Sequence, residues 1–208
     1  MRKILVGISG ASGMPLALRL LEHLAAMPEV DLSCVFSAGA AAVLDAECGL
    51  SPEALTRHAR HVHAADDLGA GPASGSWWHG SDAPAAMLLV PCSMGTLGAL
   101  ASGATRNLVQ RAADVALKEG LRLILVPRES PLSAIHLRNM LTLREAGAVI
   151  MPFCPGFYLR PANLEALLDN FCGRIFDQAG LAHGFGRWAP DGAGPEPPQR
   201  LVSQGDQP

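Results

Sequence analysis

The feature that most constrains the fold is a repeated alternation of short apolar runs with longer helical segments. Strands separated by helices of roughly 10–15 residues are typical of βαβ units. Their right-handed crossovers place helices on both faces of a parallel sheet. The sequence therefore predicts a doubly wound α/β fold, with strands at Lys3 to Ile8, Leu32 to Phe36, Met87 to Val90, Leu123 to Val126 and Ala148 to Met151.

The chain length and the segments between these runs indicate one domain. A chain of 208 residues with 49% hydrophobic and 17% charged residues fits a single α/β core. We expect this domain at 1–188, with helices at Pro15 to Ala26, Thr105 to Glu119 and Ala162 to Gly180. Ala65 to Pro84 is rich in Gly, Ser, Asp and Pro and predicts a long loop. Ala189 to Pro208 is rich in Pro and Gly and predicts a flexible tail.

Charge and cysteine usage exclude several classes of protein. A net charge of −3 without a basic stripe argues against nucleic-acid binding. The first apolar run is too short for a signal peptide or a membrane span, so we expect a cytoplasmic protein. The cysteines are odd in number and contain no CxxC pair, which predicts buried thiols in a reducing compartment. They are Cys34, Cys48, Cys92, Cys154 and Cys172.

Two turns of small residues follow predicted strands. Gly7 to Gly13 lies between the first strand and the first helix, where backbone N–H groups and the helix dipole favour an anion. Alone this pattern is weak, because a tight turn without a ligand has the same composition. It lacks the Gly-Lys-Ser/Thr ending of a P-loop. Pro91 to Thr96 forms a second such turn, and two turns at the carboxyl ends of parallel strands favour a cofactor site. Within it we interpret Cys92 as a packed thiol.

Charged residues near the later strands are candidates for chemistry. Arg111, Asp114 and Lys118 share one helix face, and the pattern alone favours a solvated, salt-bridged surface. Arg128 and Glu129 follow a strand at the sheet's carboxyl edge, which favours a functional role.

Two further sets of residues are ambiguous from the sequence. Tyr158 is the only tyrosine and lies in a Pro-rich loop, where either a site residue or a buried, hydrogen-bonded phenol is consistent with the pattern. His58, His61 and His63 match no common zinc spacing. We expect a surface helix end followed by a strand there, and no metal.

The order of several motifs resembles the UbiX family of flavin prenyltransferases, from Lys3 to about Trp188. The motifs are Gly7 to Gly13, Ala73 to Ser76, Pro91 to Ser93, Arg111 to Glu119, Val126 to Leu132, Gly147 to Pro152 and Gly156 to Tyr158. The resemblance implies a flavodoxin/Rossmann-like subunit in a homododecamer, with FMN at a subunit junction.

The resemblance also implies roles for individual residues. Those expected to contact FMN are Gly10, Ala11, Ser12, Ser37, Ser93, Met94, Gly95, Thr96 and Arg128. Those expected to act in catalysis are Glu129, Lys118, Tyr158 and Arg174, of which the last three also surround the prenyl substrate, with Arg111, Glu47 and Trp188 as further candidates.

The implied reaction transfers the dimethylallyl group of dimethylallyl monophosphate to N5 and C6 of reduced FMN, without a metal. The product would serve a UbiD-like decarboxylase. Cationic side chains and the tyrosine hydroxyl would stabilise the leaving phosphate, an aromatic ring such as Trp188 would shield an allylic cation, and Glu129 or the phosphate would remove the C6 proton.

The sequence departs from the family pattern at several positions. They are Met14-Pro15-Leu16, Ala38, Arg106, Leu159 and the inserted Trp77-Trp78-His79, which we expect near the flavin ring. Two alternatives therefore stay open. One is an FMN-dependent cysteine decarboxylase, although its histidine and its Pro-x-x-Asn-x-x-Met stretch are not evident, and the other is an FMN-binding assembly without catalysis.

Overall fold

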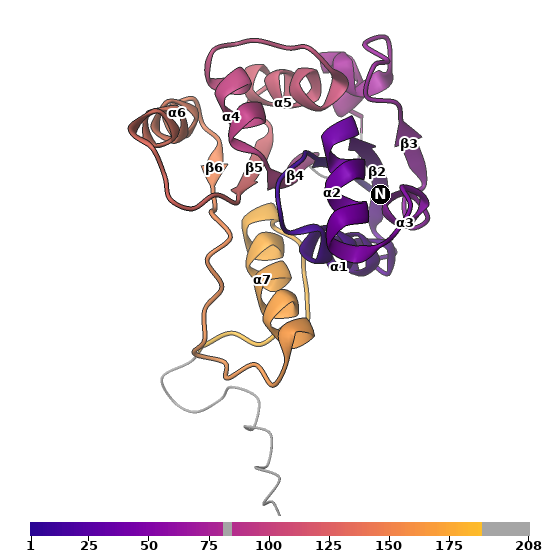
Figure 1. The fold of residues 1–208 in the computed structure, drawn as a ribbon. Coiled ribbons are helices and arrows are strands. Elements are labelled where there is room, and N and C mark those ends of the chain that lie inside the picture. Colours follow the sequence, from indigo (N-terminus) through magenta and orange to yellow (C-terminus); the bar gives the residue numbers. More distant parts are fainter. Residues whose placement is uncertain (81–84, 189–208) are drawn as a thin grey trace, which may run out of the picture.

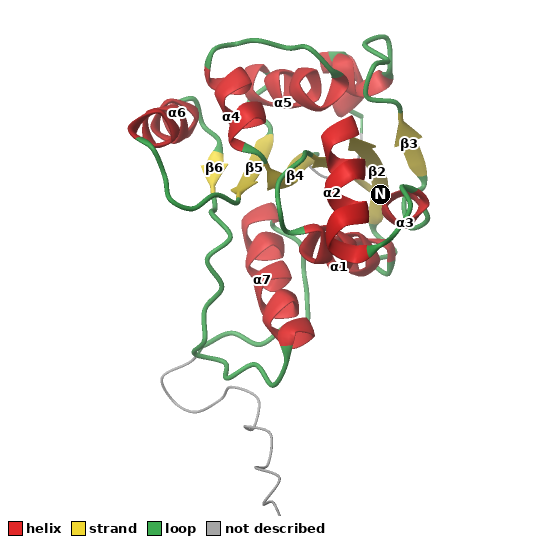
Figure 2. Cartoon of the chain, in the orientation of Figure 1, coloured by secondary structure: helices red, strands yellow, loops and turns green. Residues whose placement is uncertain are grey.

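The described residues, 1–80 and 85–188 of the computed structural model, form one sheet of six parallel strands. Figure 1 shows the sheet between two groups of helices, and Figure 2 shows the same arrangement by secondary structure. The strands are β1 (Arg2–Ile8), β2 (Val30–Phe36), β3 (His61–His63), β4 (Ala86–Cys92), β5 (Arg122–Pro127) and β6 (Val149–Ile150).

The strand order is β3-β2-β1-β4-β5-β6, which is the Rossmann order. Without the three-residue edge strand β3, the remaining five follow the flavodoxin order. The predicted doubly wound fold is confirmed, and each predicted apolar run lies in or overlaps a strand. The order reverses between β1 and β4, so ligand-binding turns are expected at their carboxyl ends.

Alternating residues of the strands serve two separate cores. Ile4, Val6 and Ile8 of β1 face one core, and Leu5 faces the other. This alternation is the period of a strand buried on both sides. Helices α1 (Met14–Ala25) and α7 (Leu164–Ala179) cover the first face, and α4 (Met94–Ala101) and α5 (Leu108–Lys118) cover the second. The other helices are α2 (Ala38–Cys48), α3 (Glu53–Thr56) and α6 (Ala134–Glu145).

The long loop after β3 packs against the second core through a large aromatic residue. It contains the short 3-10 helices η1 (Gly71–Ala73) and η2 (Gly75–Trp78). Trp78 is 1% exposed in the second core, and its indole Nε1–H donates to the Pro72 carbonyl at 3.1 Å. The predicted loop is therefore structured through residue 80, while 81–84 and the predicted tail at 189–208 lie outside the described residues.

The cysteines do not all follow the prediction. Cys34, Cys92 and Cys172 are buried, and burial raises the pKa of all three thiols, to about 12 for Cys34 and Cys172. This burial confirms Cys92 as a packed thiol. Cys154 is exposed and Cys48 is half-buried, so the prediction was wrong for Cys154. Cys154 lies in the irregular segment after β6. None of the helices among the described residues is long and apolar enough to span a bilayer.

A charged cluster joins α1 to α7 on the first face. The Asp169 carboxylate accepts hydrogen bonds from Arg19 Nε at 2.6 Å and Arg19 Nη2 at 2.9 Å, and it lies 2.7 Å from His23 Nε2. The two N–H groups of one guanidinium thus bind both carboxylate oxygens, which fixes the geometry as well as the charge. This contact sets the position of α7, the helix that carries Arg174.

Replacing Asp169 with asparagine should lower the melting temperature at pH 7. The Arg19 hydrogen bonds lower the pKa of Asp169 against the opposing effect of burial, and His23 adds to the lowering. A carboxylate with a lowered folded-state pKa stabilises the fold above its ordinary pKa of about 4, and this contribution is lost as the pH falls through the folded value. The difference in melting temperature between the wild type and Asp169→Asn should therefore narrow between pH 7 and about pH 3. The exposed Glu29→Gln is the control, and a gap that does not change with pH would contradict this linkage.

Candidate active site

Ser9 ties together the two turns at the point where the strand order reverses. Its side chain is buried, its N–H and its hydroxyl each donate to the Pro91 carbonyl at 3.1 Å, and its Oγ accepts from the Ser93 N–H at 2.7 Å. The two predicted small-residue turns therefore lie side by side at the carboxyl ends of β1 and β4. Sequence reasoning did not single out Ser9, although a serine directly after an apolar strand within a glycine-rich turn was an available signal.

The turn after β1 lies directly against the first turn of α2. A methyl group at Gly10 would lie 2.8 Å from the carbonyl carbon of Gly39, so only glycine fits. Ser37 caps α2 by accepting the Ala40 N–H at 3.2 Å. The expected FMN contacts after β1 and β2 are thus neighbours in space.

The first turn of α4 follows β4 at the same carboxyl end of the sheet. The Ser93 hydroxyl accepts the Thr96 N–H at 3.2 Å and donates to Thr96 Oγ1 at 3.1 Å. Nothing lies within 4 Å of the position that a Cβ at Gly95 would occupy, so this turn has an open side. Small residues, capped helix ends and an open side fit a flat flavin ring and its polar tail. The contacts of these residues with FMN stay a prediction.

Glu47 occupies the N-terminus of α1. Its carboxylate reaches across from the last turn of α2 and accepts the Gly13 N–H at 3.0 Å and the Met14 N–H at 2.8 Å. Burial opposes its ionisation, but hydrogen bonds from Ser12, Gly13 and Met14 and the charge of Arg128 lower its pKa. The anion at the dipole of α1 is therefore Glu47 itself, where the sequence had suggested a ligand.

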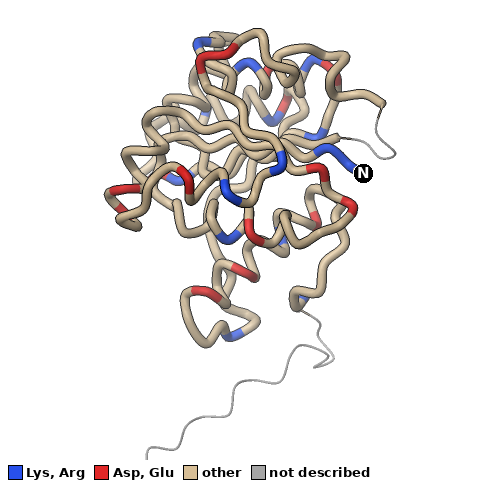
Figure 3. The backbone as a smooth tube through the Cα atoms, turned by 90° about the vertical axis from the view of Figure 1, so that its right-hand side faces the viewer, with Lys and Arg blue, Asp and Glu red and all other residues tan. Residues whose placement is uncertain are grey.

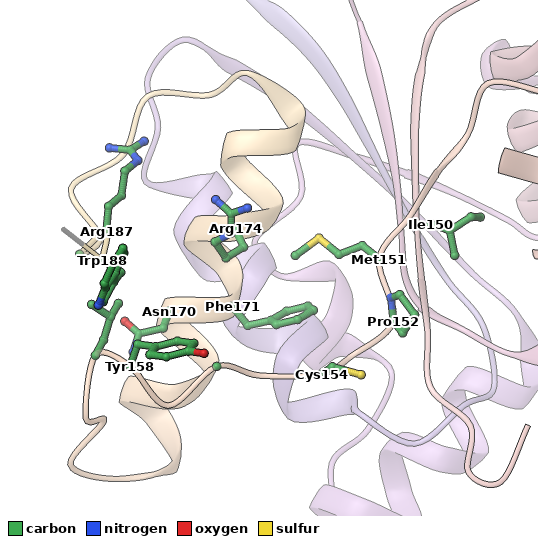
Figure 4. A pocket seen from close by; sticks show the side chains of 13 residues that line it. Ile150, Met151, Pro152, Cys154, Tyr158, Asn170, Phe171, Arg174, Arg187 and Trp188 are labelled. Carbon is green, nitrogen blue, oxygen red and sulfur yellow. The ribbon is translucent and has the colours of Figure 1, made fainter. Parts of the chain in front are cut away.

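A pocket of about 680 Å³ lies between the segment after β6, α7 and the end of the described chain (Figure 4). Three predicted residues line it: Tyr158, Arg174 and Trp188. Tyr158 is 82% exposed and its ring centroid lies 6.3 Å from that of Trp188, so the alternative of a buried phenol was wrong. The rest of the lining is largely apolar and comprises Ile150, Met151, Pro152, Cys154, Gly156, Leu159, Asn170, Phe171, Gly186 and Arg187.

Asp177 organises one wall of this pocket. Its Oδ2 accepts Arg174 Nη1 at 2.7 Å, and its Oδ1 accepts Arg187 Nη2 at 2.6 Å and lies 3.0 Å from His183 Nε2. Burial opposes ionisation, but the hydrogen bonds from Arg187 and His183 lower the pKa of Asp177. Sequence reasoning missed Asp177 and Arg187, although Asp177 lies one helical turn after Arg174.

Other predicted residues lie away from this pocket. Arg111 forms an ion pair with Asp114 at 2.7 Å, as the helical spacing predicted. Lys118 forms an ion pair with the carboxylate of Glu119, which also lies 3.3 Å from His79 Nε2. These residues belong to α5 and the loop beside it, on the face opposite α7.

The last predicted catalytic residue, Glu129, is exposed after β5, where its Oε1 accepts the Ser130 N–H at 3.0 Å. His61 and His63 lie on the edge strand β3, which follows α3 as the non-metal interpretation predicted. Across the described ranges, no three His, Cys, Asp or Glu side chains are grouped so as to hold a metal ion.

The fold and these turns define a class of protein, and comparison with known proteins gives the family. The Flavoprotein family model matches residues 1–175. The flavin prenyltransferase UbiX of Deinococcus radiodurans is 45% identical over 192 residues, covering 92% of this chain and 95% of its own. The mitochondrial flavin prenyltransferase PAD1 of Saccharomyces cerevisiae is 42% identical, covering 90% of this chain and 75% of its own.

Solved structures agree with this result. A complex of AnUbiX (PadA1) with FMN and dimethylallyl pyrophosphate is 42% identical with a TM-score of 0.85, covering 90% of this chain and 97% of its own. A dodecameric FMN-dependent UbiX-like decarboxylase from Escherichia coli O157:H7 is 40% identical with a TM-score of 0.84, covering 90% of this chain and 99% of its own. The FMN-dependent cysteine decarboxylase TvaF is 20% identical with a TM-score of 0.59 and shares the fold alone.

The chain is a flavoprotein by fold and family. Within that class it belongs to the UbiX family of flavin prenyltransferases. The predicted resemblance, the prenyltransferase class and FMN as cofactor are thereby confirmed.

Replacing Gly10 with alanine should disturb the edge at which FMN is expected. The added methyl group collides with the Gly39 backbone and must displace the start of α2, at a cost of about 1–3 kcal/mol. We expect a lower melting temperature and less FMN retained per protein, measured by visible absorbance. Gly184→Ala is the matched control, because nothing lies within 4 Å of a Cβ there. Equal FMN content in the two variants would count against this placement of the flavin.

Proposed function

We propose that this chain transfers the dimethylallyl group of dimethylallyl monophosphate to N5 and C6 of reduced FMN. The observation that carries the proposal is the pocket in which Tyr158, Arg174 and Trp188 meet an apolar lining. An apolar cavity with a cation and a phenol at one wall suits a ligand that joins a short hydrocarbon to a phosphate.

Each residue of the pocket has a role that follows from its chemistry. Reduced FMN, when bound, supplies the nucleophilic ring atoms that accept the prenyl group. Arg174 and the Tyr158 hydroxyl stabilise the phosphate as its bond to the prenyl carbon breaks and negative charge grows on its oxygen. The Trp188 ring lies beside Tyr158 and shields developing positive charge on the prenyl group from water. Glu129 lies outside the pocket, after β5, and we assign to it the removal of the C6 proton, with the released phosphate as the alternative base.

The site is completed between copies of the chain in a homo-oligomer, which we expect to be a dodecamer. Lys118 and Arg111 lie on α5, across the sheet from Arg174 on α7, so one chain alone does not bring them together. Figure 1 shows α5 and α7 far apart. Helix α6 also carries Ile135, Leu137 and Leu141 at 64%, 53% and 58% exposure, which an interface would cover. The E. coli relative named dodecameric supports this proposal. The product would pass to a UbiD-like decarboxylase in the cytoplasm.

The first experiment is an anaerobic incubation of the FMN-loaded protein with reduced FMN and dimethylallyl monophosphate, followed by mass spectrometry of the extracted flavin. We expect a flavin heavier by one C5H8 unit from the wild type. Glu129→Gln should retain FMN and yet fail to accumulate the ring-closed product, because the amide cannot take the proton. Unaltered product from Glu129→Gln would assign the proton to the phosphate. Unchanged FMN from the wild type would favour the alternative of a non-catalytic FMN-binding assembly.

Co-expression of two inactive variants tests the shared site. Lys118→Met and Arg174→Met each remove a phosphate-binding charge and should each abolish turnover alone. If the two side chains act in one site from different copies, mixed oligomers contain some sites with both charges intact and should regain part of the wild-type rate. Oligomers of each variant alone are the controls. Size-exclusion chromatography shows whether the mixed oligomers are assembled. Assembled mixed oligomers that recover no turnover would contradict the shared site.

A further inference from the structure

Asp177 brings two arginines to the same pocket. Arg174 comes from α7 and Arg187 from the segment that follows it, and both side chains line the pocket. Figure 4 shows the two guanidinium groups on the side of the pocket where Tyr158 and Trp188 lie. Each binds a different oxygen of the Asp177 carboxylate, at 2.7 Å and 2.6 Å.

The charges in this cluster do not balance. One carboxylate faces two guanidinium groups, so these three groups together keep a net positive charge. The Asp177 side chain is 18% exposed, whereas Arg174 and Arg187 are 63% and 59% exposed. The carboxylate is thus largely covered, while both arginines line the pocket and stay largely exposed. An exposed pair of arginines held at a fixed spacing suits a phosphate group, whose several oxygens accept N–H donors from both sides.

We propose that Arg187 is a second phosphate-binding arginine for the prenyl donor, acting together with Arg174, and that Asp177 is the positioning residue that sets the spacing of both. This inference rests on the proposed function and adds a residue to it.

The segment that carries Arg187 is held to α7 by packing as well as by charge. A methyl group at Gly173 would lie 2.9 Å from Phe185 Cβ, which shows how closely the segment approaches the helix. The Phe185 ring lies 4.8 Å from that of His23 and is stacked at 6.0 Å on that of Phe176. Removing the Arg187 charge therefore leaves these contacts in place, and the substitution tests charge rather than folding.

The test compares the full-length, FMN-loaded wild type with Arg187→Met, Arg187→Lys and the control Arg57→Met. Arg57 is exposed after α3, by the opposite edge of the sheet. Calorimetry measures the Kd for inorganic phosphate, and turnover assays measure KM for dimethylallyl monophosphate.

For Arg187→Met we expect both constants to rise about tenfold, the effect of losing one charged hydrogen-bonded contact. Arg187→Lys keeps the charge but loses the bidentate geometry of the guanidinium group, so we expect Kd and KM values between those of the wild type and Arg187→Met. Arg57→Met should match the wild type in both constants.

Unchanged phosphate binding by Arg187→Met would overturn the proposal, and so would a lower melting temperature with an unchanged Kd, which indicates a structural role only. If Arg187→Met does not assemble, the Arg187→Lys constants decide in the same way. The failure of the proposed function is a separate result, because a wild type that makes no prenylated flavin can still be tested for phosphate binding through Arg187.

Discussion

The hydrogen bonds of Ser9 hold the edge of the sheet on which the rest of the site depends. Strands β1 and β4 are neighbours, but the helices that follow them go to opposite faces. Ser9 joins the two turns: its N–H and its hydroxyl donate to the Pro91 carbonyl, and its Oγ accepts from the Ser93 N–H. A buried hydroxyl that both donates and accepts a hydrogen bond is held rigidly, because losing either hydrogen bond leaves an unpaired polar group. The edge is therefore preformed for a cofactor.

Charged side chains have different partners in the two parts of the candidate site. The Glu47 carboxylate pairs with the N-terminus of α1 and interacts with the charge of Arg128, while Arg174 and Arg187 make one wall of the pocket basic. Figure 3 shows acidic and basic residues mixed over the backbone, without one dominant sign. Under the proposed function, an anionic substrate would be attracted by this local arrangement of arginines and not by the net charge of −3.

Much of the fold could be predicted because its signals are local. Apolar runs predicted the five strands other than β3, and Pro15 and Gly180 marked the start of α1 and the end of α7. The edge strand β3 has no apolar run, because its three residues are His61, Val62 and His63, and it was expected only as the alternative to a metal site at these histidines. Its existence depends on pairing with β2, which is a tertiary contact.

The site was predictable only in part, for a similar reason. Residues in turns after strands were found, since topology places such turns at one edge. Asp177 and Arg187 were missed because their contact requires the chain to reverse after Gly180 and return along α7. The exposure of Tyr158 was also invisible, because a phenol in a Pro-rich loop has the same sequence whether it is covered or not.

The two-sided architecture explains why the proposed site needs more than one copy. A doubly wound sheet places successive helices on opposite faces, and here α5 and α7 fall on different ones. The sheet between them is filled with buried apolar side chains, so no rotamer of Lys118 reaches the pocket of its own chain. A second copy can present its α5 to this pocket without any change in the fold of either chain. In the proposed oligomer, association would close the exposed pocket against water and add a cation to the wall that holds Arg174 and Arg187.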